Sequence, residues 1–184
     1  MTDRPRTDQA DQLTAVEFAS LRTEIVKHYE IQFQLVAVAV VALGTMLSVG
    51  YQTKNAAIMS LYPLLSLMLG AYWLNMAEAI LRCADYIRST IEPLMRASHV
   101  GWESHLSSMP IRRLSFGYWG VRGIFLGGPV VALLSAATTS QWSPIDIVTF
   151  TIGALATGLT FAVFISWRER SPAGLSRGSF PPRA

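Results

Sequence analysis

Four apolar stretches divide the sequence and restrict what it can fold into. The first, second and fourth are each about 20 residues long, enough to cross a ~30 Å hydrocarbon core at 1.5 Å per residue. The third is shorter and gains length from the flanking Tyr118-Trp119-Gly120. The pattern predicts an all-α membrane protein with four transmembrane helices. The stretches cover residues 31–50, 56–74, 123–138 and 145–167.

The basic residues predict how these helices are oriented. Fourteen of the 15 Lys and Arg residues fall in the two tails or in the long middle segment 82–122, and the short links hold only Lys54. Basic residues next to membrane helices stay on the cytoplasmic side. We therefore expect a multi-pass protein of the plasma or bacterial inner membrane with both termini in the cytoplasm.

The composition of the chain argues against some classes of function. The chain of 184 residues is 51% hydrophobic, which fits one compact membrane domain. Its net charge of +3 does not indicate nucleic-acid binding, because the basic residues cluster beside apolar segments, where topology explains them. The one cysteine, Cys83, cannot form an intramolecular disulfide. The first apolar stretch lacks a small-residue cleavage pattern and should remain as an anchor.

The first two helices are predicted to be longer than the bilayer requires. Thr14 and Glu17 form a capping box that would start the first helix after a disordered tail. Pro93 should end the second helix, and Pro63 should kink it. Each helix would then be about 54 Å long and project some 20–25 Å from the membrane. The predicted divisions are a tail 1–12, helices 13–50 and 55–92, a cytoplasmic insert 93–117, helices 118–139 and 144–167, and a flexible basic tail 168–184.

The projecting parts carry matching apolar stripes, which we expect to pack as an antiparallel helical stalk in the cytoplasm. The apolar stripe of the second helix follows heptad spacing. On the opposite face of the same helix, charges of opposite sign alternate, which is typical of a solvated helix. The first stripe comprises Phe18, Leu21, Ile25 and then His28 or Tyr29; the second comprises Ile80, Ala84, Ile87, Ile91 and Leu94; the charged face comprises Glu78, Arg82, Asp85, Arg88 and Glu92.

The third span contains a helix-packing motif. Gly123 and Gly127 stand in a GxxxG frame, followed by Gly128 and Pro129. Small residues at this spacing let helix backbones approach closely. We expect these four residues to pack within the monomer, with dimerisation as the less favoured alternative, and Pro129 to bend the helix near mid-membrane.

The sequence holds no recognisable catalytic set, and we predict no catalytic residue, no metal and no other cofactor. Glu24 and His28 have a metal-compatible spacing, and His99, Glu103 and His105 lie together in the insert, but no HExxH motif or Cys cluster accompanies them. No ionisable residue lies deep in an apolar stretch, which argues against coupled transport. A membrane enzyme is therefore only the third hypothesis.

Several short motifs between residues 20 and 105 are similar to those of a family of small bacterial four-helix integral membrane proteins. The resemblance implies no activity. It suggests that these features belong together at the cytoplasmic base of the first two helices. The motifs are Leu21-Arg22-Thr23-Glu24-Ile25, Tyr62-Pro63, Trp73-Leu74-Asn75, Arg82, Tyr86-Ile87-Arg88, Ile91-Glu92-Pro93 and Gly101-Trp102-Glu103.

The favoured hypothesis is a non-enzymatic membrane module whose stalk and insert bind a cytoplasmic protein, while the bundle is anchored in the lipid bilayer. The alternative is an oligomeric pore opened from the cytoplasmic side, with the glycine-rich third helix along the path. Four helices are too few for an aqueous lumen, so a pore would require a homo-oligomer. The residues predicted to bind the partner are Glu24, His28, Arg82, Tyr86, Trp102 and Glu103.

Overall fold

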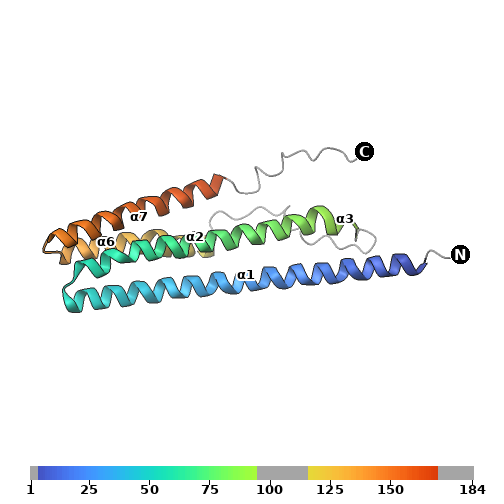
Figure 1. Cartoon of the computed structure of the whole chain (residues 1–184), viewed down its shortest axis with the longest axis horizontal. Coiled ribbons are helices and arrows are strands. Elements are labelled where there is room, and N and C mark those ends of the chain that lie inside the picture. Colours follow the sequence, from blue (N-terminus) through green and yellow to red (C-terminus); the bar gives the residue numbers. More distant parts are fainter. Residues whose placement is uncertain (1–3, 95–115, 170–184) are drawn as a thin grey trace. The chain divides into compact units, whose positions relative to one another are not determined.

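The computed structural model describes the backbone of residues 4–94 and 116–169 and the side chains of 12–93 and 119–167. Every regular element in these ranges is a helix (Figure 1). Four of the helical stretches are long and apolar enough to cross a membrane, which confirms the predicted number of spans and the all-α class. They are Gln12–Thr53, Ala56–Ile91, Trp119–Thr139 and Pro144–Trp167.

Helix α1 (Arg4–Thr53) begins ten residues before the predicted start at Thr14. Pro5 lies in its first turn, where a missing backbone N–H costs nothing because those N–H groups have no partner within the helix. No Gly or Pro follows until Gly44, so Thr14 and Glu17 lie inside the helix and are not its cap. Most of the tail predicted to be disordered is therefore helical from Arg4 onward.

The link between α1 and α2 (Ala56–Tyr86) is two residues long, shorter than the four residues between the predicted helices 13–50 and 55–92. Lys54 adopts a left-handed conformation with φ 52°, which ends α1. The backbone N–H of Asn55 then donates to the Gly50 carbonyl at 3.0 Å. The Asn55 side-chain oxygen accepts from the N–H of Ala57 at 3.1 Å and caps α2.

Within residues 4–94 and 116–169, two π-helical turns interrupt the helices, and each ends two residues before a proline. Turn η1 (Ile87–Ile91) precedes Pro93, and turn η3 (Gly123–Gly127) precedes Pro129. Proline lacks the N–H that would bond the carbonyl four residues earlier, and its ring clashes with that carbonyl. Widening the helix by one residue relieves the clash. The predicted bend at Pro129 therefore corresponds to a wider turn just before it. The neighbouring helices are α3 (Glu92–Leu94), α5 (Phe116–Arg122) and α6 (Gly128–Thr139).

Helix α7 (Pro144–Glu169) starts at a capping box that sequence inspection missed. The N–H of Asp146 donates to the Ser143 hydroxyl at 3.2 Å, and the N–H of Ser143 donates to the Asp146 carboxylate at 3.2 Å. Pro144 occupies the first helical position, which proline favours. This reciprocal cap fixes where the fourth span begins.

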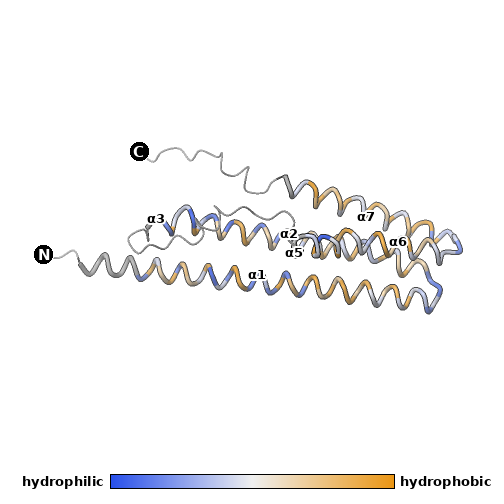
Figure 2. The backbone as a smooth tube through the Cα atoms, turned by 180° about the vertical axis from the view of Figure 1, so that it is seen from behind, coloured by the Kyte–Doolittle hydropathy of each residue, from blue (hydrophilic) through white to orange (hydrophobic). Residues whose placement is uncertain are grey.

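The chain divides into two compact units. Unit 1 comprises residues 1–34 and 75–115, and unit 2 comprises residues 35–74 and 116–184. Apolar residues dominate α6, α7 and the unit 2 parts of α1 and α2, whereas polar residues are frequent in unit 1 (Figure 2). Unit 2 holds two apolar clusters. One contains Ala39, Leu74, Phe125 and Phe164 with surrounding residues that include Trp73 and Trp167, and the other contains Ala56, Met59 and Ala136.

Glycines outside the predicted GxxxG pair make the closest helix contacts in unit 2. A Cβ added to Gly153 would lie 2.6 Å from the Ser60 carbonyl oxygen, and one added to Gly70 would lie 3.1 Å from the Phe164 ring. These short distances show that α7 and α2 approach closely.

The four residues of the predicted packing motif differ in their surroundings. Gly128 faces Tyr62, whose hydroxyl would lie 2.9 Å from an added Cβ, and Pro129 is fully buried. A Cβ at Gly123 or Gly127 would meet no described atom within 4 Å. Packing of these two glycines within the monomer therefore stays a prediction that no described contact supports. The buried residues of the third span are Arg122, Phe125, Gly128, Pro129, Ala132 and Ala136, whereas Gly123 is exposed and Gly127 is partly exposed.

Candidate functional site

The candidate site is the helix pair of unit 1, formed by residues 12–34 of α1 and residues 75–93 of α2, η1 and α3. It has its own apolar core. Ile25 is buried against Ile80, Ile87 and Ile91, the last two being 0% and 1% exposed. Burying one such side chain contributes about 1.5–3 kcal/mol. The cluster brings together residues of both predicted apolar stripes. Phe18, Leu21 and Cys83 pack around it.

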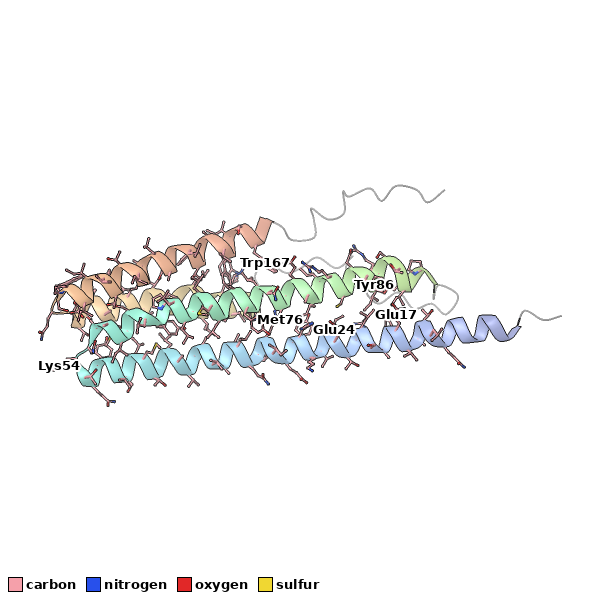
Figure 3. All side chains as sticks on the ribbon, viewed as in Figure 1. Glu17, Glu24, Lys54, Met76, Tyr86 and Trp167 are labelled. Carbon is pink, nitrogen blue, oxygen red and sulfur yellow. The ribbon has the colours of Figure 1, made fainter. Side chains whose placement is uncertain are left out.

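A hydrogen bond between side chains joins the two helices on the surface of this pair. The Tyr86 hydroxyl donates a hydrogen bond to the Glu17 carboxylate at 2.8 Å. The two side chains point toward each other from α2 and α1 (Figure 3). Tyr86 is 42% exposed, so the bond is open to solvent and contributes less than a buried one. It sets the position of the tyrosine ring on the outer surface.

Two ion pairs lie along α2 and η1. Arg82 contacts Glu78 at 2.7 Å, and Arg88 contacts Asp85 at 2.5 Å. The Arg82 side chain is 75% exposed. Exposed pairs contribute about 0–1 kcal/mol, so the fold of unit 1 does not depend on them. Their four charges form a surface of alternating sign, available for contact with another molecule.

Glu24 and His28 form a pair on α1, with the His28 Nε2 atom 3.5 Å from a Glu24 carboxylate oxygen. The Glu24 side chain is 56% exposed and that of His28 only 19%. The His28 Nδ1 atom is buried and has no hydrogen-bond partner. Glu24 is therefore the more accessible residue of the two, whereas most of the His28 side chain is covered.

Each of the four predicted site residues that the structure describes has a side-chain partner. Arg82 pairs with Glu78, Tyr86 with Glu17, and Glu24 with His28. Trp102 and Glu103 lie outside the described residues. Glu17 was missed because it was assigned to a helix cap. Glu17 lies seven residues, or one heptad, before Glu24 and therefore on the same face of α1. This spacing could have indicated that Glu17 belongs to the candidate site.

The charged and polar groups on the surface of the helix pair can bind another molecule. Within residues 12–93 and 119–167, no three His, Cys, Asp or Glu side chains are placed to hold a metal ion. The exposed groups of the helix pair include carboxylates, guanidinium groups and the phenols of Tyr29 and Tyr86, which can form ion pairs and hydrogen bonds with a protein surface. Comparisons with family models, curated proteins and solved structures found no match to this chain.

Proposed function

We propose that the protein is a non-enzymatic, multi-pass protein of the plasma or bacterial inner membrane that binds a cytoplasmic protein. In this proposal both termini are cytoplasmic, and the unit 1 helix pair is the antiparallel stalk predicted from the sequence. The insert 93–117, with Trp102 and Glu103, would extend the binding surface. Unit 2 anchors the stalk in the lipid bilayer.

The length of the helices is the observation that carries the proposal. Helix α1 has 50 residues, or about 75 Å, and the span Ala56–Ile91 has 36 residues, or about 54 Å. A hydrocarbon core of ~30 Å leaves a large part of each outside the lipid. The ion pairs Glu78–Arg82 and Asp85–Arg88 are costly to place in hydrocarbon, which favours unit 1 as the part outside. A separate apolar core allows this part to stay ordered in water.

The orientation predicts which residues an impermeant reagent can reach. Asn55 and Asp85 are both exposed, and they would lie on opposite sides of the membrane. In intact cells, with Cys83→Ser as background, an impermeant maleimide should label Asn55→Cys and spare Asp85→Cys. Permeabilised cells provide the control, because both variants should then react. Labelling of Asp85→Cys in intact cells would place unit 1 outside and contradict the proposal.

Partner binding predicts site-specific cross-linking in living cells. A photoreactive amino acid at position 85 should give one discrete adduct, identified by mass spectrometry. Reversing the charges with Arg82→Glu and Arg88→Glu should lower its yield about tenfold, which corresponds to ~1.4 kcal/mol of binding energy. Tyr86→Ala should also lower the yield, because the ring would be removed from the surface.

Two controls separate binding from misfolding. The photoreactive group at Leu155, which is 70% exposed on α7, should give no adduct with the same protein. Lys54→Glu, in the link between α1 and α2, should leave the adduct at position 85 unchanged. An adduct at position 85 that persists in the charge-reversed variant would show that the charged surface does not bind the partner.

A further inference from the structure

The short loop between α6 and α7 exposes a tryptophan in an unfavourable backbone conformation. Trp142 is 53% exposed, and its φ of 56° lies in the left-handed region. A bulky side chain rarely adopts this conformation, which glycine or asparagine adopts more readily. Such strain persists only where surrounding contacts hold it, and it is frequent at functional positions. The contacts around Trp142 therefore indicate what the conformation is for.

Hydrogen bonds within the loop hold the tryptophan in place. The Ser140 hydroxyl accepts from the backbone N–H of Trp142 at 2.9 Å and donates to the Asp146 carboxylate at 3.2 Å. The same carboxylate oxygen accepts from the N–H of Ser143 at 3.2 Å, so Asp146 bonds to residues on both sides of the tryptophan. The Trp142 ring packs edge-on against Phe150, with ring centroids 5.8 Å apart. These bonds fix the direction of the indole and pair polar groups that would otherwise require water.

The exposed indole lies next to the end of an apolar surface on α7. The exposed apolar residues of this helix recur every three or four positions, so they lie on one side of it. They are Ile145, Val148, Ile152, Leu155 and Leu159, which are 42–70% exposed. Helix α7 is long and apolar enough to cross a membrane, and such a side then faces the acyl chains. Ile145, three residues after Trp142, is the first residue of this side and is 70% exposed.

We propose that residues 140–146 are an interfacial anchor that binds the boundary between the headgroups and the acyl chains of the lipid bilayer. Trp142 and Ile145 are its inserted side chains. An indole suits this boundary because its ring is apolar and its N–H can bond to headgroup oxygens or water. Asp146 is a positioning residue, whose bonds hold the indole at the level where α7 enters the lipid. The anchor lies in unit 2, and it depends neither on partner binding by unit 1 nor on which side of the membrane the loop faces.

Fluorescence quenching by brominated lipids tests where the indole lies. The wild type and Trp142→Phe are compared in nanodiscs, and the difference between their emissions is the contribution of Trp142. Acyl chains brominated near the headgroup should remove about half or more of this contribution, and chains brominated near their ends should remove clearly less. Quenching by acrylamide in water without an effect of brominated lipids overturns the proposal, because the indole would then lie in water. Strongest quenching by the chain-end bromines also overturns it, because the loop would then lie in the hydrocarbon core.

Variants of Asp146 test its positioning role. Asp146→Ala removes the acceptor of both bonds, so quenching of Trp142 by chains brominated near the headgroup should fall about threefold. Asp146→Asn keeps an oxygen that can accept both bonds, and it should retain the wild-type quenching. The matched control is Thr151→Ala on the same helix, which loses only a hydrogen bond to the Ile147 carbonyl and should also leave the quenching unchanged. Unchanged quenching in Asp146→Ala, or an equal loss in Asp146→Asn, overturns the role of these bonds.

Discussion

Replacing Ile87 by alanine is expected to destabilise the unit 1 helix pair by about 2–5 kcal/mol, the usual cost of cutting a buried isoleucine back to alanine. Ile87 is 0% exposed and belongs to the cluster of Ile25, Ile80 and Ile91. The loss removes apolar contacts and leaves a cavity that two helices alone can fill only partly. Hydrogen exchange of the backbone amides of residues 12–34, measured in nanodiscs, should become faster by a factor of about 30 or more.

The matched control for Ile87 is Val26→Ala on α1. Val26 is 56% exposed, so its truncation should change the exchange of the same amides by less than threefold. Amides in the unit 2 spans should stay protected in both variants. If Ile87→Ala left residues 12–34 as protected as in the wild type, the four isoleucines would not be what stabilises unit 1. The proposed stalk would then lose its physical basis.

Replacing Gly153 by alanine is expected to lower the free energy of unfolding of unit 2 by about 1–3 kcal/mol. The new Cβ would lie 2.6 Å from the backbone carbonyl oxygen of Ser60, a distance that requires the backbone to move. The Leu133 side chain, 3.1 Å away, restricts movement on another side. Titration with SDS in mixed micelles, monitored by tryptophan fluorescence, measures the change.

The control for this prediction is Gly158→Ala on the same helix. A Cβ at Gly158 meets no described atom within 4 Å, and alanine favours helix over glycine by about 1 kcal/mol. Gly158→Ala should therefore be neutral or slightly stabilising. The gain in helix propensity is the same at both positions, so the difference between the two variants reports packing at Gly153. Equal effects at both positions would contradict the close approach of α7 to α2.

Hydropathy and length were sufficient to predict the four spans, because a bilayer accepts only segments that are long, apolar and internally hydrogen-bonded. The helix ends were harder to predict. Thr14 and Glu17 have the pattern of a cap but lie inside α1, since a capping box also fits a helix interior when nothing upstream breaks the helix. The true reciprocal cap, Ser143 with Asp146, carries the same kind of pattern and was overlooked.

The sequence indicated which residues of the unit 1 helices share a face, but not which residues of the two helices are in contact. Heptad spacing indicated which residues of each helix share a face, and Ile25, Ile80, Ile87 and Ile91 lie in one core. The spacing of residues within one helix does not determine how far that helix is shifted along its axis relative to its neighbour. The contact between Glu17 and Tyr86, 69 residues apart in the chain, therefore appeared only in the structure.

The sequence by itself determined the all-helical class, the number of spans and the apolar faces, because these follow from composition and periodicity along one helix. Only the tertiary structure decided which glycines make close contacts and how the Phe125 carbonyl is satisfied. Gly153 meets Ser60 and Phe125 meets Ser66 because helices far apart in sequence pack at a particular rotation and height. No periodic pattern within a single helix encodes that relation.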